Sequence, residues 1–465
     1  MRDLVLGIDV GTSGVRVAAI DHNAKVVAFE TTTMPAAHRE GHRITQDATV
    51  WGRALDDAIT RLAAVLDISR VRALAVDGTS GTLVAVDDCG VPVTEGSLYN
   101  DRADDESVAA IKRCAPPHTA VHGATSPLAR AMRLLRAGGV AKILHQADWI
   151  GGQFSGRFDI SDESNSLKTG YDPIVRAWPD WIAATGVEPG KLLPMVVPAG
   201  TIIGQVSAEA MRRFGLPTRA LVVAGSTDGC AAFLATGADK PGHAVTSLGS
   251  TLVLKLASEH PVFAPEYGLY SHRIGDLWLA GGASNTGGAV LAQFFTAREI
   301  RDNSQRINPS IVSGLDYYPL TTPGERFPIN DPTFEPRMTP RPDDDALFLQ
   351  GLFEGIAKIE ALGYQRMAEF GGPQPTCVTT VGGGATNEIW SCPCSACQSS
   401  RLKARRQPSA SHGWPCARWE RNPDHEARHR FARDRQSGPA ACPVRNIHEQ
   451  FDSQFIQSRN MPTFR

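Results

Sequence analysis

The residues with the clearest chemical potential surround Asp9. This carboxylate follows the apolar run Leu4–Ile8, and the polar turn Gly11-Thr12-Ser13 and then Arg16 come directly after it. Glycine permits a tight turn in which successive backbone N–H groups converge on an anion, and the hydroxyls add further donors. A carboxylate at a strand end can hold Mg²⁺ through water. The pattern predicts a phosphate-binding hairpin with Mg²⁺ at Asp9, and an ordinary hairpin is the alternative.

Two more glycine turns occur much later in the chain. The turn Gly249-Ser250-Thr251 lies between the apolar runs 244–248 and 252–254, so it repeats the strand, turn and strand order. The triplet Gly382-Gly383-Gly384, with Asn387 close behind, follows the apolar run Cys377–Val381 and offers flat backbone for a purine. Two phosphate-type hairpins so far apart predict two related domains that face each other across a cleft.

Further polar residues follow apolar segments in the first half of the chain. Asp228 lies between the apolar runs Ala220–Ala224 and Cys230–Leu234, which predicts a carboxylate at the cleft. Its alternative role is an N-cap of the following helix. Candidate ligand-binding side chains also occur in two predicted turns, where ordinary turn or surface roles are the alternative: Asp77, Thr79, Ser80, Asn100 and Asp101.

Periodicity indicates the elements that must position these residues. Alternating and continuous apolar runs predict strands at 4–8, 15–20, 25–32, 71–76, 83–86, 220–224 and 277–280. Helical spacing predicts a helix that starts near Asp47, another at Gly288–Phe295 that the segment Gly281–Asn285 opens, and a long one at Ala346–Phe370.

Composition limits the function classes. A chain of 465 residues predicts two domains. The formal net charge of −2 gives no broad reason to expect nucleic acid, and no apolar run reaches the roughly 18 residues of a membrane span. Arg2 and Asp3 interrupt any signal peptide, so we expect a cytoplasmic enzyme with isolated reduced thiols at Cys89, Cys114, Cys230 and Cys377. The sequence does not indicate an oligomeric state.

The segment from Ser391 to Arg465 has a different character. It holds thirteen Lys and Arg against six Asp and Glu, and Ser, Pro, Arg, His and Cys replace the apolar periodicity. We interpret residues 391–465 as an aberrant, disordered tail produced by a reading-frame shift near Trp390. The alternatives are a basic nucleic-acid-binding tail and a zinc site built from Cys392, Cys394, Cys397, His412, His425 and His429.

The chain up to about residue 390 resembles the FGGY carbohydrate kinases, and most closely their D-ribulokinase-like branch. The segments that carry the resemblance are Gly7–Gly14, Val76–Thr82, Leu98–Asp101, Gln146–Trp149, Leu167–Tyr171, Ala224–Asp228 and Gly314–Leu320. The resemblance implies an α/β, two-domain actin/hexokinase/Hsp70-like ATPase (ribonuclease H-like) fold. Its N-terminal domain would span residues 1–236, and an incomplete C-terminal nucleotide domain would span residues 237–390.

The resemblance also implies ATP-dependent, direct in-line phosphorylation of a small-molecule sugar, with Asp228 as the base. Asp9 would organise Mg²⁺, and the remaining roles divide into three groups. Phosphate contacts would come from Gly11, Thr12, Ser13, Arg16, Gly249, Ser250 and Thr251, adenosine contacts from Gly382, Gly383, Gly384 and Asn387, and sugar contacts from Asp77, Thr79, Ser80, Asn100 and Asp101.

The predicted sugar is D-ribulose. Ser80-Gly81 stands where xylulokinase-like relatives carry a Gln-Met pair, which argues against xylulose. The alternatives are another sugar or polyol kinase, acting on xylulose or ribitol, and a sugar-binding pseudokinase impaired by its altered C-terminus. A nucleotide-driven assembly protein of the Hsp70 or actin type would share the hairpins but would not need the Asp77–Thr82 and Asn100-Asp101 turns.

Overall fold

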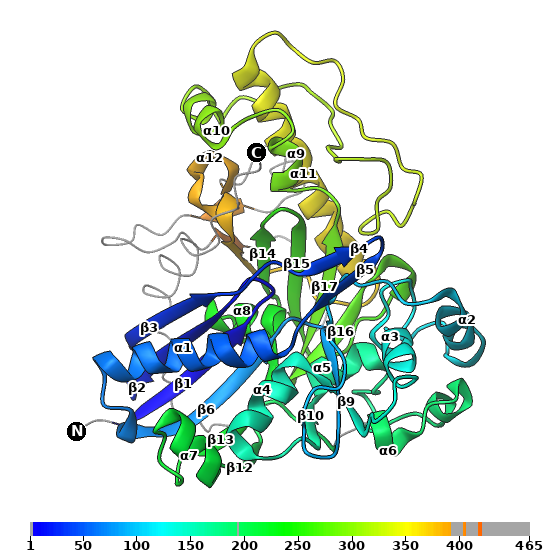
Figure 1. The fold of residues 1–465 in the computed structure, drawn as a ribbon. Coiled ribbons are helices and arrows are strands. Elements are labelled where there is room, and N and C mark those ends of the chain that lie inside the picture. The colour runs from blue at the N-terminus through cyan, green and yellow to red at the C-terminus, as the bar shows by residue number, and fades with distance from the viewer. Residues whose placement is uncertain (1–2, 193–194, 392–402, 406–416, 421–465) are drawn as a thin grey trace, which may run out of the picture. The chain divides into compact units, whose positions relative to one another are not determined.

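The computed structural model describes residues 3–192, 195–391, 403–405 and 417–420 (Figure 1). The chain divides into two compact units. The first, here the N-terminal unit, comprises Met1–Ala235 and His272–Asp276, and the second, the C-terminal unit, comprises Thr236–Ser271 and Leu277–Arg465. The predicted boundary after residue 236 lies next to this division.

A six-stranded sheet forms the centre of the N-terminal unit. Its order is β12 (Ile202–Gln205), β13 (Leu221–Thr227), β6 (Val71–Gly78), β1 (Leu4–Val10), β2 (Gly14–Asp21) and β3 (Val26–Thr33). β1 pairs antiparallel with β2, which confirms the predicted hairpin, and parallel with β6 on its other side. β13 in turn runs parallel to β6, so the carboxyl ends of three adjacent strands meet at one edge.

Gly225 lets β13 approach β6 at this edge. A Cβ atom on Gly225 would lie 1.8 Å from the carbonyl oxygen of Val76, so every other residue type would push the two strands apart. The strand register shifts between Val223 and Ser226 at the same place. This irregularity carries the end of β13 to the position from which Asp228 emerges.

The strand after the 77–82 turn leaves this sheet. β7 (Leu83–Val86) belongs to a five-stranded sheet of order β4 (His38–Glu40), β5 (Arg43–Gln46), β8 (Gly96–Ser97), β7 and β9 (Lys142–His145), and a two-stranded sheet pairs β10 (Ile160–Asp162) with β11 (Met195–Val197). The helices of this unit are α1 (Thr49–Val65), α2 (Asp105–Cys114), α3 (Pro127–Leu134), α4 (Gln146–Ser155), α5 (Glu163–Ser166), α6 (Pro189–Leu192), α7 (Ala208–Phe214) and α8 (Asp228–Ala235).

Helix α1 shows how the N-terminal core is packed. Trp51 is fully buried, its indole N–H donates to Gln46 at 2.7 Å, and its ring meets Trp149 edge to face at 6.0 Å. Burial of large apolar side chains of this kind contributes about 2–3 kcal/mol each. The helix start differs slightly from the prediction, because Ala48 is the N-cap and Asp47 accepts the backbone N–H of Thr49 at 2.9 Å.

The C-terminal unit repeats the hairpin arrangement of the first. Its seven-stranded sheet has the order β16 (Tyr270–Ile274), β17 (Leu277–Ser284), β15 (Leu252–Ser258), β14 (His243–Leu248), β18 (Cys377–Val381), β20 (Ala417–Glu420) and β19 (Lys403–Arg405). β14 pairs antiparallel with β15 and parallel with β18, as β1 does with β2 and β6. The predicted second hairpin is therefore confirmed.

The helices of the C-terminal unit include one correct and one incorrect prediction. They are α9 (Gly288–Leu291), α10 (Ala297–Ser304), α11 (Asp345–Glu369) and α12 (Glu388–Ser391). The long helix α11 is confirmed, whereas the helix expected at Gly288–Phe295 is limited to four residues. The segment Gly281–Asn285 was expected to open that helix, but strand β17 continues through it as far as Ser284. A Cβ on Gly282 would lie 2.7 Å from the ring of Phe327, so its small size serves close packing.

Two short strands lie in the segment from residue 391, and the expected disorder of that segment stays a prediction. β20 pairs with β18, and β19 pairs with β20, so residues 417–420 and 403–405 extend the C-terminal sheet. The rest of the predicted disordered tail, and the candidate zinc ligands in it, lie outside the described residues. Cys89, Cys114 and Cys230 are free thiols as expected, but Cys377 is disulfide-bonded, which corrects that expectation.

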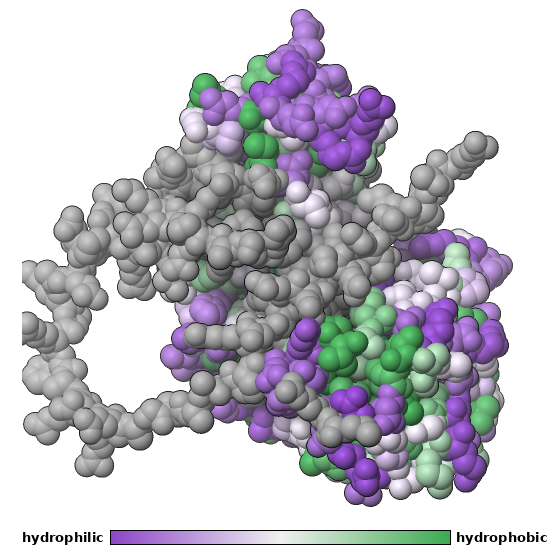
Figure 2. Space-filling model, turned by 90° about the vertical axis from the view of Figure 1, so that its left-hand side faces the viewer, coloured by the Kyte–Doolittle hydropathy of each residue, from purple (hydrophilic) through white to green (hydrophobic). Residues whose placement is uncertain are grey.

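Within the described residues, no helix is long and apolar enough to cross a membrane. Figure 2 shows hydrophobic side chains gathered low on the face that it presents, with hydrophilic side chains beside them.

Candidate functional site

Three aspartates meet where the parallel strands of the N-terminal unit end. Asp9 pairs with Asp77 in the register of β1 and β6, and Ser226, two residues before Asp228, pairs with Asp77 in the register of β6 and β13. Parallel strands present their carboxyl ends at the same edge, where ligand sites of α/β sheets usually form. The structure therefore brings together Asp9, Asp77 and Asp228. The sequence had predicted that Asp77 contacts the sugar.

The electrostatics of the cluster confirm that the three carboxylates are close. Burial, and then the negative charges of Asp9 and Asp228, raise the pKa of Asp77 well above its usual range, while Arg16 opposes the rise. Two like charges at this distance disfavour full ionisation. Asp77 thus holds a proton at pH values at which an exposed aspartate has lost it, and it can donate that proton to the Asp9 carboxylate.

Arg16 takes part in this cluster from β2. Its guanidinium donates to Asp9 at 2.8 Å, and both side chains are largely buried. The turn before it has the predicted hairpin geometry, with the Gly11 N–H donating to the Gly14 carbonyl at 3.0 Å. Thr12 and Ser13 are exposed and accessible to an anion. The phosphate contacts of Thr12, Ser13 and Arg16 stay predictions.

Asp228 is the first residue of α8. Its Oδ1 accepts the backbone N–H of Gly229 at 2.7 Å, so the carboxylate lies at the start of the helix, inside it rather than at the N-cap position before it. A helix start favours a negative charge, because its first backbone N–H groups have no partner within the helix. The role of Asp228 as a base stays a prediction.

The turn after β6 carries polar atoms that have no hydrogen-bond partner among the described residues. Thr79 is buried, and its N–H donates to the Val10 carbonyl and to Gln146 Oε1, both at 3.2 Å. Ser80 Oγ and Thr82 Oγ1 are inaccessible to solvent and accept or donate no hydrogen bond within the described structure. More than nine in ten buried polar groups in folded proteins have a partner, so these hydroxyls indicate a ligand site.

Asn100 and Asp101 have different environments. Asn100 Oδ1 is another buried oxygen without a partner among the described residues. Asp101 is fully buried and accepts the Ile44 N–H at 3.0 Å, the Ser97 hydroxyl at 2.6 Å and the Arg133 guanidinium. The carboxylate of Asp101 thus ties several segments together in this structure, and its predicted sugar contact would compete with those bonds.

Arg130 links the same network to the 79–82 turn. This fully buried side chain donates to the carbonyl oxygens of Ser97, Leu98 and Gly81. Burial lowers the pKa of Arg130 to about 9, which the charge of Asp101 partly offsets. The two predicted sugar-binding turns are therefore held to one buried cation, which fixes their relative position.

Two residues near the carboxylates were missed by sequence analysis. Gln146 begins α4 and contacts the 79–82 turn, and Asn165 of α5 donates through Nδ2 to the Ser226 carbonyl at 3.2 Å. Gln146 Nε2 and Asn165 Oδ1 are buried, and no described residue satisfies them. The only signal in the sequence was that Gln146 lies in one of the family-like segments, because no local pattern reports contacts between α4, α5 and the sheet.

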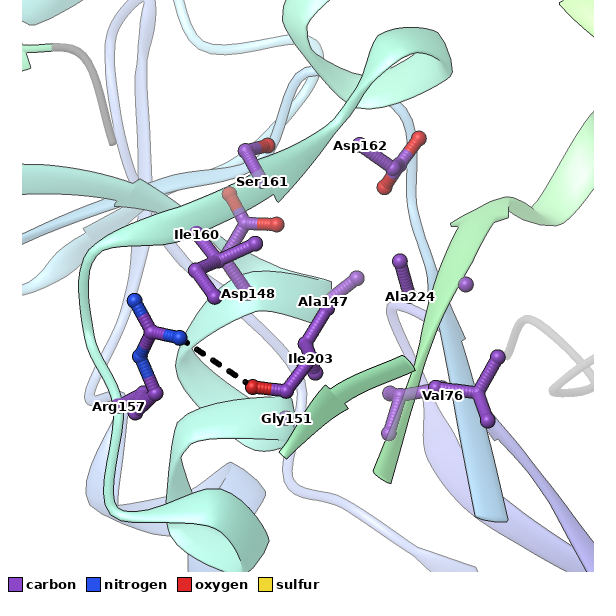
Figure 3. A pocket seen from close by; sticks show the side chains of 12 residues that line it. Val76, Ala147, Asp148, Gly151, Arg157, Ile160, Ser161, Asp162, Ile203 and Ala224 are labelled. Carbon is purple, nitrogen blue, oxygen red and sulfur yellow. Dashed lines mark hydrogen bonds between the residues drawn. The ribbon is translucent and has the colours of Figure 1, made fainter. Parts of the chain in front are cut away.

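A small cavity adjoins these helices (Figure 3). Asp148, Ser161 and Asp162 line it together with Val76 and Ala224. Burial, and next the charge of Asp148, raise the pKa of Asp162 to about 6, although its bonds with Asn165 oppose the rise. Both ring nitrogens of His145 are hydrogen-bonded, Nδ1 with Asp148 at 2.7 Å and Nε2 with Thr169 at 2.8 Å. The polar side chains beside this cavity therefore bond mainly to one another, and they hold α5 in place.

The glycine turns of the C-terminal unit offer backbone rather than charge. The Gly249 carbonyl accepts the Gly288 N–H at 2.8 Å, and the Ser250 carbonyl accepts the Ala289 N–H at 3.1 Å, so the turn is fixed against α9. Gly382 has a φ of 90°, which favours glycine, and a Cβ there would lie 2.8 Å from the Leu248 carbonyl. The phosphate role of Gly249, Ser250 and Thr251 stays a prediction.

The rest of the predicted adenosine loop is mixed. A Cβ on Gly384 would lie 2.4 Å from the Trp390 ring, whereas one on Gly383 would meet no described atom within 4 Å. The Asn387 side chain accepts the N–H groups of Ile389 and Trp390 and donates to Ser304 at 2.8 Å. Asn387 therefore caps α12, and Gly383 is the most open backbone of the loop.

Comparison with known proteins agrees with this arrangement. Residues 4–126 match the N-terminal domain of the FGGY family of carbohydrate kinases. A xylulose kinase of Escherichia coli (strain K12) is 24% identical over 428 residues, which cover 83% of each chain. An autoinducer-2 kinase of Yersinia enterocolitica is 26% identical and covers 84% of this chain and 80% of its own length.

Solved structures share the fold. A ligand-bound xylulose kinase from Lactobacillus acidophilus superposes with a TM-score of 0.74 at 16% identity, covering 84% of both chains. A Plasmodium falciparum glycerol kinase with ADP superposes with a TM-score of 0.71 at 14% identity, covering 84% of this chain and 83% of the other. The predicted two-domain actin/hexokinase-like ATPase fold is thereby confirmed. Residues 4–126 therefore form an N-terminal domain of the FGGY carbohydrate kinase type, and the chain is similar to sugar kinases over most of its length.

Proposed function

We propose that this sugar kinase transfers the γ-phosphoryl group of ATP to a hydroxyl of a neutral ketopentose, with D-ribulose as the preferred acceptor. The observation that carries the proposal is the aspartate cluster at the ends of β1, β6 and β13, with buried and unsatisfied hydroxyl and amide atoms beside it. Hydroxyl groups of a polyol can both donate to and accept from such atoms. The cluster and the polar turn together provide a base and a binding surface.

Asp228 acts as the base in this proposal. Its carboxylate takes the proton of the acceptor hydroxyl as that oxygen bonds to the γ-phosphorus, and the bond to the β-phosphate oxygen breaks. The raised pKa of Asp77 supports this division of roles, because a protonated Asp77 removes one negative charge from the neighbourhood. An approaching phosphate then meets less repulsion.

Mg²⁺ would enter with the nucleotide. A magnesium ion bound to phosphates needs only one or two carboxylates of the protein and keeps several waters. Asp9, placed at 2.8 Å from Arg16 and beside the open turn of Thr12, fits such a water-mediated contact. Thr12, Ser13 and Arg16 would hold the transferring phosphate, and the open backbone of Gly383 would hold the adenosine.

D-Xylulose is the second candidate acceptor. The relatives that are named xylulose kinases support it, although their identity to this chain is low. Ser80 and Gly81 favour D-ribulose, because small side chains there leave the unsatisfied Ser80 hydroxyl free to meet the sugar. A polar surface made of neutral groups and carboxylates also disfavours sugar acids.

A panel of acceptors tests the proposal. ADP release is measured with ATP, Mg²⁺ and D-ribulose, D-xylulose, ribitol, glycerol or gluconate, against ATP alone. We expect the highest kcat/KM for D-ribulose. A clear preference for xylulose or glycerol would refute the ribulose assignment, and ATP hydrolysis that no sugar stimulates would favour a nucleotide-driven assembly protein.

The segment from residue 391 requires its own test. We propose that the native end of the second domain has been replaced there, so that nucleotide binding is weakened and turnover by this chain is low. Sugar binding without turnover would be the behaviour of an impaired pseudokinase. Replacing residues 391–465 by an in-frame, family-like C-terminus should restore turnover, and vigorous turnover by the chain as it stands would contradict the proposal. The variants described below are therefore measured in the form of the chain that shows turnover, with either the present or the restored C-terminus.

A further inference from the structure

Gln146 holds both ends of the turn that follows β6. Its Oε1 accepts the Thr79 N–H at 3.2 Å, and its own backbone N–H donates to the Thr82 carbonyl at 3.0 Å. The side chain is 1% exposed. The first residue of α4 therefore lies directly against the turn that carries Ser80.

The NH₂ group of the Gln146 amide has no hydrogen-bond acceptor among the described residues. Because the Thr79 N–H is a donor, the atom facing it must be the carbonyl oxygen, which fixes the NH₂ group on the other side. Gln146 Nε2 is inaccessible to solvent and finds no acceptor in the described parts of the chain. A buried donor without an acceptor is unfavourable, so the fold has a reason to complete this bond with a ligand.

Complementary atoms surround the same edge of the sheet. Asn165 Nδ2 donates to Asp162 at 2.6 Å and to the Ser226 carbonyl, which leaves Oδ1 as an acceptor that no described donor reaches. Ser80 Oγ and Ser226 Oγ are also buried, and no described residue bonds either of them. Ser226 pairs with Asp77 in the sheet, so these atoms lie next to the carboxylates. One fixed donor, one fixed acceptor and two hydroxyls form a set that neutral hydroxyl groups can satisfy.

We propose that Gln146 is a specificity-determining residue, whose Nε2 donates a hydrogen bond to one oxygen of the bound sugar while Oε1 holds the turn at Thr79. This inference rests on the proposed function, since it needs a neutral sugar beside the aspartate cluster. The ligand oxygen is a hydroxyl or the ketose carbonyl. A ligand that lacks this oxygen leaves the amide unsatisfied and is rejected.

Binding of sugars to the full-length chain, measured by calorimetry without nucleotide, tests this role. The probes are D-ribulose and analogues of it that each lack one hydroxyl or the carbonyl oxygen. Wild type is compared with Gln146→Met, which keeps the length of the side chain but has no donor. Gln153→Met on the same helix is the matched control, because Gln153 accepts a hydrogen bond from Arg213 at 2.8 Å and contacts the turn through no hydrogen bond among the described residues.

We expect one analogue to bind wild type at least about 10-fold more weakly than D-ribulose, and Gln146→Met to bind that analogue and D-ribulose within about 2-fold of each other. Gln153→Met should behave as wild type. If Gln146 has only a structural role, Gln146→Met should weaken the binding of all sugars equally, and each analogue should still bind more weakly than D-ribulose by the same factor as in wild type. That result would overturn this inference but not the proposed function. A wild-type chain that binds none of the neutral sugars would overturn the proposed function as well.

Discussion

The two units contain the same strand arrangement with different side chains. In each, an antiparallel hairpin lies beside a later parallel strand: β1 and β2 beside β6, and β14 and β15 beside β18. Asp9 pairs with Arg16 and Asp77 in the first. Ser247, one residue before the end of β14 as Asp9 is in β1, pairs with Val253 and Val381 in the second. Charged residues at three positions of one unit thus correspond to neutral ones in the other.

This difference separates two tasks of a kinase site. A glycine turn at the end of a strand provides backbone N–H groups in both units, which suits phosphate binding. Among these three equivalent positions, carboxylates that could serve as a base or hold Mg²⁺ occur only beside the first hairpin. We infer that the chemistry belongs to the N-terminal unit and that the C-terminal unit contributes nucleotide binding through its backbone.

The largest expected effect comes from Asp228→Asn. Asparagine keeps the shape of the side chain but cannot take the proton of the acceptor hydroxyl, and loss of a general base lowers the rate by about 10²–10⁴. We expect kcat to fall by this factor while the Kd of the sugar changes little, as measured by steady-state kinetics and calorimetry. Asp57→Asn on the exposed face of α1 is the control. Retention of most of the turnover would show that Asp228 is not the base.

Asp9→Ala should have the second largest effect and directly tests the comparison of hairpins. Removing the carboxylate leaves Arg16 without its 2.8 Å partner and takes away the proposed Mg²⁺ contact. A loss of turnover on the order of 10², with a higher Mg²⁺ requirement, is expected from a magnesium titration. Ser247→Ala, at the equivalent position of the other hairpin, should leave the titration unchanged. Equal effects of both variants would contradict the division of tasks.

Asp77→Asn should remove part of the pH dependence of stability. A carboxyl group whose pKa is raised by folding stabilises the folded state at pH values below its unfolded pKa, and this stabilisation is lost as the pH rises toward the folded pKa. Since folding raises the pKa of Asp77, the melting temperature of wild type should fall as the pH rises above about 4, where an ordinary aspartate ionises. The variant should show a shallower decline between pH 4 and pH 8, and an identical slope would refute the effect.

The smallest effect is expected at the glycine loop. A methyl group on Gly383 contacts no described atom, so Gly383→Ala should fold normally. The same variant should weaken ATP binding by about 1 kcal/mol, or roughly 5-fold in Kd. Gly384→Ala places its methyl group against Trp390 and should lower the melting temperature instead. Calorimetric binding of ATP and thermal melts separate the two. Unchanged ATP affinity in Gly383→Ala would remove this loop from the nucleotide site.

Local patterns were sufficient to predict the hairpins and the long helix. The turn at Gly11–Ser13 and the turn at Gly249–Thr251 lie between two apolar runs that pair with each other, so the signal is contained in a dozen residues. Helix α11 repeats its apolar face over 25 residues. The family-like segments added the roles of these elements, which periodicity alone does not report.

Contacts between distant segments were not predictable in this way. Asp77 was assigned to the sugar, because nothing in its own turn shows that β6 pairs with β1 in the register that brings Asp9 alongside. Asp101 was assigned to the sugar as a turn residue, but its partners Ile44 and Arg133 lie far away in the sequence. Gly281 and Gly282 were read as the opening of a helix, whereas their small size is required by Lys255 and Phe327 in the packed strand.

The parallel pairing of β6 with β13 has a consequence for the order in which the protein folds. About 150 residues separate the two strands, and such non-local contacts form slowly because a long loop must first be closed. During synthesis the aspartate cluster stays incomplete until Asp228 has been added, although the first hairpin can form from the first two dozen residues. Until then β6 exposes one edge to other extended chains, so aggregation should be most probable in fragments that end between β6 and β13.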